Sequence, residues 1–250
     1  TSGAAGGGGG GAIRNGGTLT MNQCRVAGNQ ALFGGGLRNE GTLTVNQSTV
    51  RENSALGNNG GGINNAGALV LNQSSISGNV ATNSGGGIRN AAAGSLSLNQ
   101  CTISGNSAPQ GAGLSHASTS ASSLINCTLA ENTATNILGG AAQTLGGAMI
   151  VTGAGPLALK NCTLAGNTGS LAGGGFFIQS PGNVSLQNVI IADNSATLGP
   201  DIYFGSGTIP RANFNLIGDN STVTGMFPAG YPNANGDFVG TAAAPLASGL

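Results

Sequence analysis

The stretch that decides the fold is GGINNAGALVLNQSSISGN, which occupies residues 61–79. It opens with two small residues and an apolar one, Gly61-Gly62-Ile63. It closes with an apolar residue, two variable residues and an asparagine, Ile76-Ser77-Gly78-Asn79. Between these two signatures, apolar and less apolar residues alternate around Leu69. Because alternation with a period of two is typical of a half-buried β-strand, the stretch predicts short strands joined by turns.

The closing signature occurs eight times, at spacings of 24, 26, 27, 26, 35, 27 and 26 residues. Its asparagines are Asn29, Asn53, Asn79, Asn106, Asn132, Asn167, Asn194 and Asn220. The opening signature recurs with a similar period, and its first five apolar residues are Ile13, Leu37, Ile63, Ile88 and Leu114. A fixed period of this length indicates a solenoid. We predict an all-β parallel β-helix (β-solenoid) in a single domain, with about eight coils of roughly 26 residues and three short strands per coil.

Stacking of the coils follows from burial, because one coil cannot bury its own apolar side chains. Stacked coils share one core and hydrogen-bond along the axis at about 4.8 Å per coil, so that eight coils give a rod about 40 Å long. One internal column is expected to be the apolar residues of the opening signature, and a second is Leu19, Leu43, Leu69, Leu96 and Leu157. The eight asparagines should form a ladder of side-chain amides, and a second ladder is expected at Asn15, Asn39, Asn65 and Asn90.

The repeat divides the chain into three parts. Residues 1–11 form a Gly-rich N-terminal segment, residues 12–220 the parallel β-helix, and residues 221–250 a C-terminal cap or docking segment. The last part holds Phe227, Tyr231 and Phe238, whose rings we expect to cover the apolar end of the last coil. The single 35-residue spacing marks an insertion of about nine residues near Thr133 to Leu145, which we expect to leave the rod as a loop.

The composition excludes two classes of partner. The chain has 48 glycines, and charged residues make up 6% of it, where roughly 25% is typical. Because the net charge is zero, there is no basic footprint for nucleic acid. There is no run of 18 apolar residues, so we predict no membrane span, and no cofactor is implied.

The few charges are unevenly placed. Residues 1–100 carry five arginines and two acidic residues, a net charge of +3, and residues 101–250 carry two basic and five acidic residues, a net charge of −3. Because coil order maps onto the rod axis, the two ends carry opposite charge. One interpretation is head-to-tail association of the chain with itself into a filament, and the alternative is that 14 charges are clustered by chance.

Two motifs carry a resemblance to known proteins. Gly10-Gly11-Ala12-Ile13 and the closing signatures resemble the Gly-Gly-small-apolar and Phe-x-x-Asn repeats of chlamydial-type polymorphic outer-membrane proteins, with Val, Ile or Leu in place of Phe. Over residues 10–220 the chain more broadly resembles right-handed parallel β-helix surface proteins of bacteria. Residues 213–218, Asn-Phe-Asn-Leu-Ile-Gly, resemble a segment of secreted β-helix proteins that carry a C-terminal sorting anchor. The resemblance implies a right-handed helix in the extracellular space or on a bacterial cell surface.

The four cysteines share one coil position, two residues before the apolar member of the closing signature: Cys24, Cys101, Cys127 and Cys162. Ser48, Ser74 and Val189 hold this position in other coils, which indicates a small buried slot, and we expect a stack of buried free thiols. Successive coils would place cysteine Cα atoms about 4.8 Å apart, so a Cys101–Cys127 or Cys127–Cys162 disulfide is the alternative. One column of parallel side chains cannot build the tetrahedron of a zinc site.

Enzymes of the pectate-lyase type share this architecture, and a resemblance to them would imply several acidic residues that bind calcium, with an arginine as base. Among the seven acidic residues, Glu52, Glu131, Asp193 and Asp219 share one coil position, and only Asp193 and Asp219 lie on adjacent coils. Two carboxylates can hold a weak calcium ion, but we expect solvated turn residues. His116 replaces an asparagine of the second ladder and is expected to be a hydrogen-bonded turn residue. We therefore predict no catalytic residue, no metal site and no enzymatic activity.

Arg14, Arg38 and Arg89 recur at one outward position, with Asn64 between them. Such a strip either binds an anionic polysaccharide or simply solvates the surface. We predict a secreted or cell-surface structural β-helix that serves as a stalk, an adhesin or a self-assembling filament subunit. The alternative is a β-helix that binds or degrades polysaccharide, and the expected partners are the chain itself or an extracellular polysaccharide.

Overall fold

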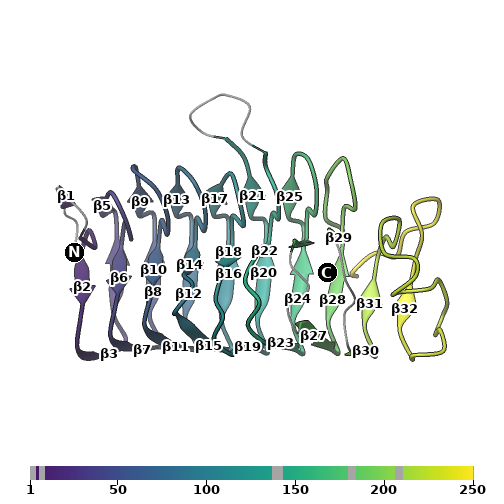
Figure 1. The fold of residues 1–250 in the computed structure, drawn as a ribbon, viewed down its shortest axis with the longest axis horizontal. Coiled ribbons are helices and arrows are strands. Elements are labelled where there is room, and N and C mark those ends of the chain that lie inside the picture. Colours follow the sequence, from purple (N-terminus) through teal and green to yellow (C-terminus); the bar gives the residue numbers. More distant parts are fainter. Residues whose placement is uncertain (1–3, 6–8, 137–142, 180–183, 206–210, 250) are drawn as a thin grey trace.

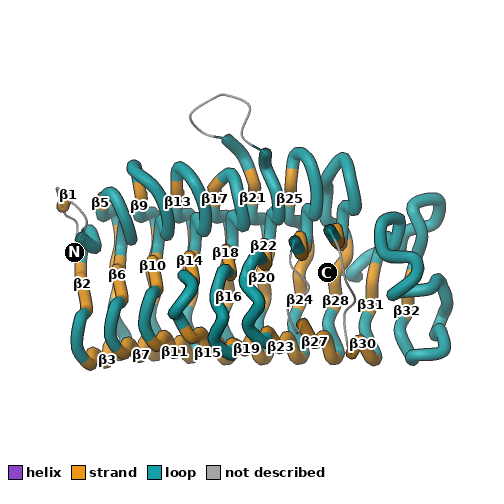
Figure 2. The backbone as a smooth tube through the Cα atoms, viewed as in Figure 1, coloured by secondary structure: helices purple, strands orange, loops and turns teal. Residues whose placement is uncertain are grey.

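The computed structural model describes residues 4–5, 9–136, 143–179, 184–205 and 211–249. These residues form 32 β-strands and no helix. The chain winds into successive coils that lie side by side, so that position along the sequence becomes position along the rod (Figures 1 and 2). The predicted parallel β-solenoid of about eight coils is confirmed.

Four parallel sheets run along the rod. Sheet I contains β2 (Ile13–Asn15), β6 (Leu37–Asn39), β10 (Ile63–Asn65), β14 (Ile88–Asn90), β18 (Leu114–His116), β22 (Met149–Val151), β26 (Phe176–Ile178) and β29 (Ile202–Phe204). Sheet II contains β3 (Thr18–Asn22), β7 (Thr42–Asn46), β11 (Ala68–Asn72), β15 (Ser95–Asn99), β19 (Ser122–Ile125), β23 (Leu157–Lys160), β27 (Val184–Gln187) and β30 (Arg211–Asn213).

The other two sheets follow in each coil. Sheet III contains β4 (Arg25–Ala27), β8 (Thr49–Arg51), β12 (Ser75–Ser77), β16 (Thr102–Ser104), β20 (Thr128–Ala130), β24 (Thr163–Ala165), β28 (Ile190–Ala192), β31 (Leu216–Ile217) and β32 (Phe238–Val239). Sheet IV contains β1 (Ala4–Ala5), β5 (Gln30–Ala31), β9 (Ser54–Ala55), β13 (Val80–Ala81), β17 (Ser107–Ala108), β21 (Thr133–Ala134) and β25 (Thr168–Gly169).

The expectation of three strands per coil was wrong, because most coils have four. The strands of sheet IV are two residues long and directly follow the asparagine of the closing signature, as in Ser54–Ala55 after Asn53. Two residues are too few to show alternation in the sequence, yet they pair with their equivalents in the neighbouring coils. The strand β32 also extends sheet III beyond residue 220, where the helix was expected to end.

Both predicted internal columns lie in the core. In sheet I, Ile63 pairs with Leu37 and Ile88 on the neighbouring coils, and all three side chains are buried. In sheet II, Leu43, Leu69, Leu96 and Leu157 are likewise buried. Ile13 and Leu19 pack against the core but are only partly buried, because they belong to the first coil and have a neighbour on one side.

Glycine is needed where the chain passes from sheet IV to sheet I. Gly60 has a φ of 72°, a left-handed conformation that glycine adopts without steric cost. A Cβ atom on the next residue, Gly61, would lie 2.4 Å from the carbonyl oxygen of Gly86 on the following coil. The recurrent glycine runs therefore allow successive coils to approach each other at this corner.

Two other corners also use left-handed backbone. Between sheets II and III the corner residues have φ values between 48° and 58°, and they are Gln23, Gln47, Gln73, Gln100, Asn126, Asn161, Asn188 and Phe214. Between sheets III and IV the corner holds a glycine in most coils and Glu52, Glu131 or Asp193 in the others. The shared position of these acidic residues is thus a turn position, whereas Asp219 is not among the positive-φ residues.

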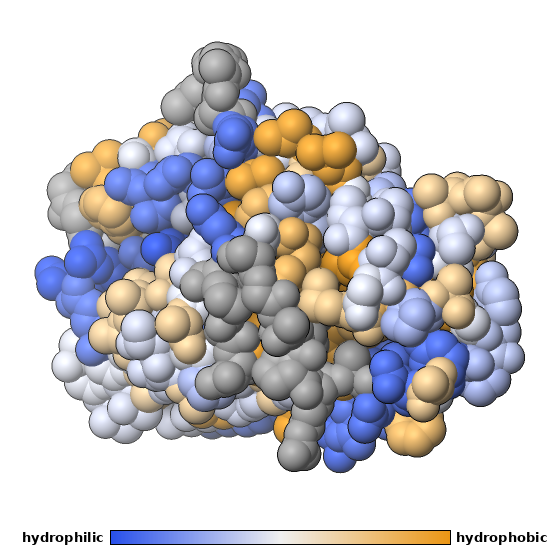
Figure 3. All heavy atoms as spheres, turned by 45° about the vertical axis from the view of Figure 1, so that its right-hand side comes forward, coloured by the Kyte–Doolittle hydropathy of each residue, from blue (hydrophilic) through white to orange (hydrophobic). Residues whose placement is uncertain are grey.

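The two ends of the rod differ. At the C-terminal end Val223, Phe227 and Val239 are buried in the core, so residues beyond 220 cover the last coil. The expectation that all three tail rings cover this end was wrong for two of them, because Tyr231 is 58% exposed and Phe238 is 48% exposed. Figure 3 brings this end forward and shows hydrophobic atoms in separate patches among polar ones.

The insertion expected near Thr133 to Leu145 lies partly outside the described residues, which omit residues 137–142. On its N-terminal side, β21 pairs in register with β17 and β25. On its C-terminal side, Leu145 forms bridges to Gln110 and Ala172 on the neighbouring coils. Both flanks of the insertion therefore keep their places in the solenoid.

Candidate functional site

The predicted asparagine ladder is present in the interior between sheets III and IV. It runs through Asn29, Asn53, Asn79, Asn106, Asn132, Asn167 and Asn194, all of them buried or nearly so. At Asn106, the Nδ2 group donates to the Oδ1 atom of Asn132 at 2.9 Å and to the carbonyl oxygen of Ile76 at 3.0 Å. The backbone N–H of Asn106 donates to the same Oδ1 atom at 3.1 Å. Each amide thus joins three coils.

The ladder does not continue to Asn220, contrary to expectation. The backbone N–H and Nδ2 group of Asn194 donate to Oδ1 of Asp201 at 3.1 and 2.9 Å, while Oδ2 of Asp201 accepts the backbone N–H of Asp219 at 2.6 Å. A carboxylate only accepts hydrogen bonds, so Asp201 ends the series of donors. Asn220 instead donates to the carbonyl oxygen of Phe227 at 2.8 Å and holds the tail against the last coil. Burial raises the pKa of Asp201 to about 6, against the hydrogen bonds from Asn194.

A second ladder lies at the end of the sheet I strands, as predicted. Asn15, Asn39, Asn65 and Asn90 are joined by Nδ2-to-Oδ1 bonds of 2.7 to 2.8 Å. The ladder ends at His116, whose Nδ1 atom lies 3.2 Å from Nδ2 of Asn90. The expected hydrogen bond of His116 is therefore found at Nδ1, whereas its buried Nε2 atom has no partner among the described residues. Burial, followed by the positive charge of Arg89, lowers the pKa of His116 to about 4.

Three amide series on the surface were missed in the sequence. Asn22, Asn46 and Asn72 are joined in one series, Gln23, Gln47, Gln73 and Gln100 in a second, and Asn126, Asn161 and Asn188 in a third. The signal was the recurrent Asn-Gln pair at residues 22–23, 46–47, 72–73 and 99–100. These amides are exposed or partly exposed, so their bonds compete with water and contribute less than the buried ones.

All four cysteines are free thiols, and Cys101, Cys127 and Cys162 are buried while Cys24 is partly exposed. They occupy the slot between sheets II and III that Ser48 and Ser74 hold in other coils, where Ser48 Oγ donates to the carbonyl oxygen of Asn46. The Sγ atom of Cys162 makes the equivalent bond to Lys160 at 3.3 Å. A hydrogen bond with Cys127 and burial raise the pKa of the Cys101 thiol, which favours its neutral form.

This column also ends on a carboxylate. The backbone N–H of Val189 donates to Oδ1 of Asn215 at 2.9 Å, and the Nδ2 group of Asn215 donates to Oδ1 of Asp237 at 3.0 Å. Asp237 is fully buried, and burial raises its pKa. Two interior columns of the rod therefore finish at its C-terminal end on an aspartate that accepts the last amide.

The three arginines of the predicted strip occupy equivalent positions on the strands of sheet I, but their side chains are not all available to a ligand. Arg14 pairs with Arg38 on adjacent strands, and both form ion pairs with Glu40, at 2.8 and 2.5 Å. Arg89 is largely buried, which lowers its pKa, and it donates to the carbonyl oxygen of Asn90 at 2.8 Å. The positive charge that was expected to bind an anionic ligand is therefore largely neutralised by Glu40 or buried.

The same outward column of sheet I changes character along the rod. After Arg89 it continues through Ser115, Ile150, Phe177 and Tyr203. Ile150 and Phe177 form a small buried cluster with Leu145 and Ala172 outside the main core. The rings of Phe177 and Tyr203 are stacked with centroids 5.1 Å apart.

Asp193 and Asp219, the carboxylates considered for calcium, line one cavity of about 270 Å³ together with Asp201. Asp193 Oδ2 accepts the backbone N–H of Ser248 at 2.8 Å as well as the Ser248 hydroxyl, and Asp219 Oδ1 accepts the backbone N–H of Ser221 at 2.7 Å. In the described part of the chain, no group of three His, Cys, Asp or Glu side chains is arranged to hold a metal ion. The Asp193 carboxylate therefore fastens the C-terminal tail to the coils, whereas the bond of Asp219 is local to its own turn.

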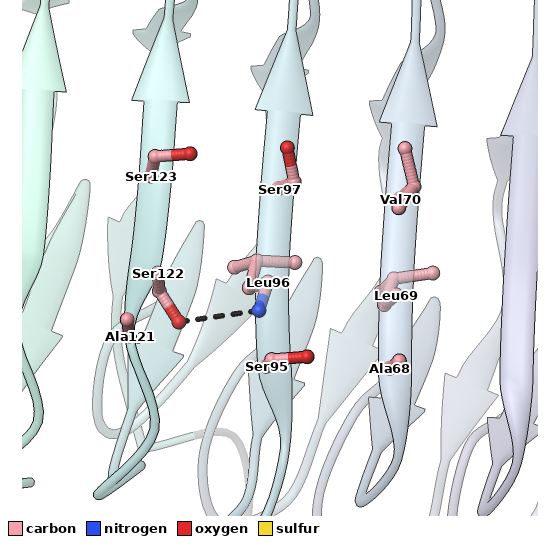
Figure 4. A pocket seen from close by; sticks show the side chains of 9 residues that line it. All are labelled: Ala68, Leu69, Val70, Ser95, Leu96, Ser97, Ala121, Ser122 and Ser123. Atoms are coloured by element: carbon pink, nitrogen blue, oxygen red, sulfur yellow. Dashed lines mark hydrogen bonds between the residues drawn. The ribbon is translucent and has the colours of Figure 1, made fainter.

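Figure 4 shows a shallow hollow of about 300 Å³ over β11, β15 and β19. It lies where Ser122 replaces the leucine of the neighbouring coils, between Leu96 and Leu157, and Ser122 Oγ accepts the backbone N–H of Leu96 at 3.2 Å. The hollow is lined by alanine, serine, valine and leucine, without a titratable side chain. It offers apolar contact and hydroxyl groups but no acid, base or nucleophile activated by a base.

A family model described as a right-handed β-helix region matches residues 66–239. The chain belongs to the right-handed β-helix family. No curated protein and no solved structure matches this β-helix. Within its described residues, no helix is long and apolar enough to cross a membrane.

We predict that a buried amide of the inner ladder contributes much more to the free energy of unfolding than a surface amide does. Asn106→Ala removes the acceptor for the backbone N–H and for one Nδ2 hydrogen of Asn79, and both hydrogens are left buried without a partner, while the second Nδ2 hydrogen keeps its bond to Val50. We expect it to lower the free energy of unfolding by about 4 kcal/mol. Asn72→Ala, which removes one surface amide bond, should cost less than about 1 kcal/mol. Denaturant midpoints followed by circular dichroism measure both, and equal losses would contradict the structural role of the inner ladder.

His116 predicts a loss of stability in acid. Because its folded-state pKa of about 4 lies below its ordinary value of 6.5, the unfolded chain takes up the proton first as the pH falls. The contribution of His116 is therefore complete above pH 6.5 and falls by about 3 kcal/mol between pH 6.5 and 4.

Asp201 changes the free energy of unfolding in the opposite direction. Because its pKa is raised to about 6, the folded protein takes up this proton first, and stability increases as the pH falls below about 6. The effect of His116 is therefore measured as the difference between the wild type and His116→Asn, in which Asp201 is common to both. Denaturation curves at pH 7, 5.5 and 4 should show the wild type losing stability relative to the variant. Parallel pH profiles would contradict the assignment.

The cysteine column predicts the reactivity of the thiols. In the native protein an aromatic disulfide reagent should modify Cys24 quickly and the three buried thiols slowly, because burial restricts access of the reagent. In denaturant without reductant, all four should react. A total of two in denaturant would instead demonstrate one of the two disulfides considered above.

Proposed function

We propose that this β-helix is a secreted or cell-surface structural protein that works as a rigid stalk or adhesin. The observation that carries the proposal is the continuity of axial bonding. Four parallel sheets and two buried amide ladders join successive coils along the rod. Bending the rod would stretch many of these bonds at once. A long, stiff body with a largely neutral polar surface fits a role in holding something away from a surface.

The opposite charges of the two halves of the rod predict a third role, self-assembly into a filament. The two ends of the rod differ in how far their core is covered. In the first coil Ile13, Leu19 and Cys24 pack against the core but are only partly buried. The opposite end is covered by Phe227 and Val239. Continuous stacking of coils into a filament requires both ends to be open, so the geometry supports a stalk or adhesin better than a filament subunit.

Carbohydrate recognition is the second candidate, and a specific observation favours it. In the part of the chain that the structure describes, three aromatic residues are exposed, and these residues, Phe214, Tyr231 and Phe238, lie within 25 residues of one another near the C-terminal end. Degradation of polysaccharide is the weaker form of this candidate. The hollow over sheet II is lined by neutral side chains, whereas hydrolysis or elimination needs a general acid or base beside the substrate.

Surface location is the part of the proposal that is most directly tested. Antibodies against the chain should label intact cells of the organism that produces it, and protease added to intact cells should remove the label. A cytoplasmic protein serves as the control that remains unlabelled. Labelling only after permeabilisation would contradict the proposal. Release of reducing or unsaturated sugar ends from neutral and acidic polysaccharides by the purified chain would replace it with the enzymatic alternative.

A further inference from the structure

The outer face of sheet III changes composition over its last three strands. Its first outward residue is Arg25, and the next five, from β8 to β24, are threonine or serine: Thr49, Ser75, Thr102, Thr128 and Thr163. The same column then becomes apolar at Ile190, Leu216 and Phe238. A face that is polar along most of the rod is thus hydrophobic at its C-terminal end.

The neighbouring corner changes at the same point. Seven coils place Gln or Asn at the left-handed corner between sheets II and III, and the eighth places Phe214 there, with φ 58°. A bulky side chain in this conformation is an outlier that costs free energy. Phe214 is 66% exposed, so it gains little hydrophobic stabilisation that would offset the cost of this backbone conformation. On the next coil the corner residue is Gly236, where a Cβ atom would lie 2.9 Å from the ring, so glycine leaves the space that Phe214 occupies.

A hollow of about 340 Å³ lies where the apolar part of the sheet III column meets the corner that holds Phe214. Phe214 and Phe238 border it, Ile190 and Leu216 form part of its floor, and its lining contains no charged side chain. Asn188 stands at its rim as the last member of a surface amide series, where it donates from Nδ2 to Asn161 Oδ1 at 3.1 Å. Because Phe214 holds the next place in that series, no amide follows to donate to the Oδ1 atom of Asn188.

We propose that this hollow binds a neutral saccharide. The C–H face of a pyranose ring is weakly positive and fits the negative face of an aromatic ring, here Phe214 or Phe238. The hydroxyl groups at the edge of the sugar can donate to the exposed Oδ1 atom of Asn188 in place of water. A purely aliphatic partner would cover this oxygen without a hydrogen bond, which carries a desolvation cost. A volume near the lower end of the range for small-molecule sites fits one or two sugar units.

The experiment uses the full chain and a panel of soluble hexasaccharides of glucose, mannose, xylose and galactose, with oligogalacturonate as the charged comparison. Saturation-transfer NMR identifies which sugar binds, and titration calorimetry measures its affinity. At least one neutral hexasaccharide should bind, and its binding should be insensitive to salt. Failure of every neutral sugar to bind at millimolar concentration would overturn the proposal.

Three variants locate the site without breaking the fold. Phe214→Asn restores the amide of the other coils and relieves the strained backbone, Phe238→Thr restores the threonine of the outward column, and Asn188→Gly removes the amide at a positive-φ position that glycine tolerates. We expect the first two to weaken binding at least tenfold and the third severalfold, with unchanged circular dichroism. Leu56→Ala, at a leucine that is 52% exposed near the other end of the rod, is the matched control and should bind normally.

Two results would distinguish a saccharide site in this hollow from the alternatives, which are a saccharide site elsewhere on the chain and a contact between two copies of the chain. Wild-type affinity in Phe214→Asn would overturn it, because the sugar would then bind elsewhere. Concentration-dependent dimerisation in sedimentation, abolished by Phe214→Asn, would instead assign the hollow to a second copy of the chain. Neither result depends on where the protein resides, so the surface location proposed above stands or falls separately.

Discussion

The buried hydrogen bond between the amides of successive asparagines is the constraint on which the rest of the rod depends. An amide such as that of Asn106 has two donors and an acceptor in an apolar interior, and they are satisfied by Asn79, Asn132 and Ile76 on the adjoining coils. A shift of one coil by a single residue would leave these groups unpaired and would move the apolar side chains of that coil out of the core. The ladder therefore fixes the register that the hydrophobic columns alone would specify less strictly.

The inner ladder also gives the rod a direction. Every bond from Nδ2 to Oδ1 in it runs toward the C-terminal end, so the last Nδ2 group needs an acceptor that does not have to donate in turn. Asp201 supplies it, and Asp237 does the same for the column that contains the cysteines. Both carboxylates are buried, and both have raised pKa values because burial disfavours their charged form. Closure of this end thus depends on two acidic groups in an otherwise weakly charged chain.

The repeat predicted the fold because each coil repeats the same burial and hydrogen-bonding requirements. Asn29 to Asn194 and Leu37 to Leu114 could be placed from their spacing alone. Asn220 could not, because Asp201, which lies 19 residues earlier in the sequence, takes its expected place as the acceptor for Asn194, and the pattern does not mark that residue. The strands of sheet IV were missed because two residues show no period. Phe214 was overlooked because its significance lies in its backbone conformation and exposure, which spacing does not reveal.

The near-identity of neighbouring coils has an evolutionary consequence. Since Ile63 meets Leu37 on one side and Ile88 on the other, a coil in the middle of the rod sees almost the same surroundings as its neighbours. Duplication or deletion of one repeat by unequal recombination would lengthen or shorten the molecule by about 4.8 Å without creating a new interface. The specialised C-terminal end, with its aspartates and covering tail, would be inherited unchanged, so that the length of the rod would vary while the chemistry of this end stays the same.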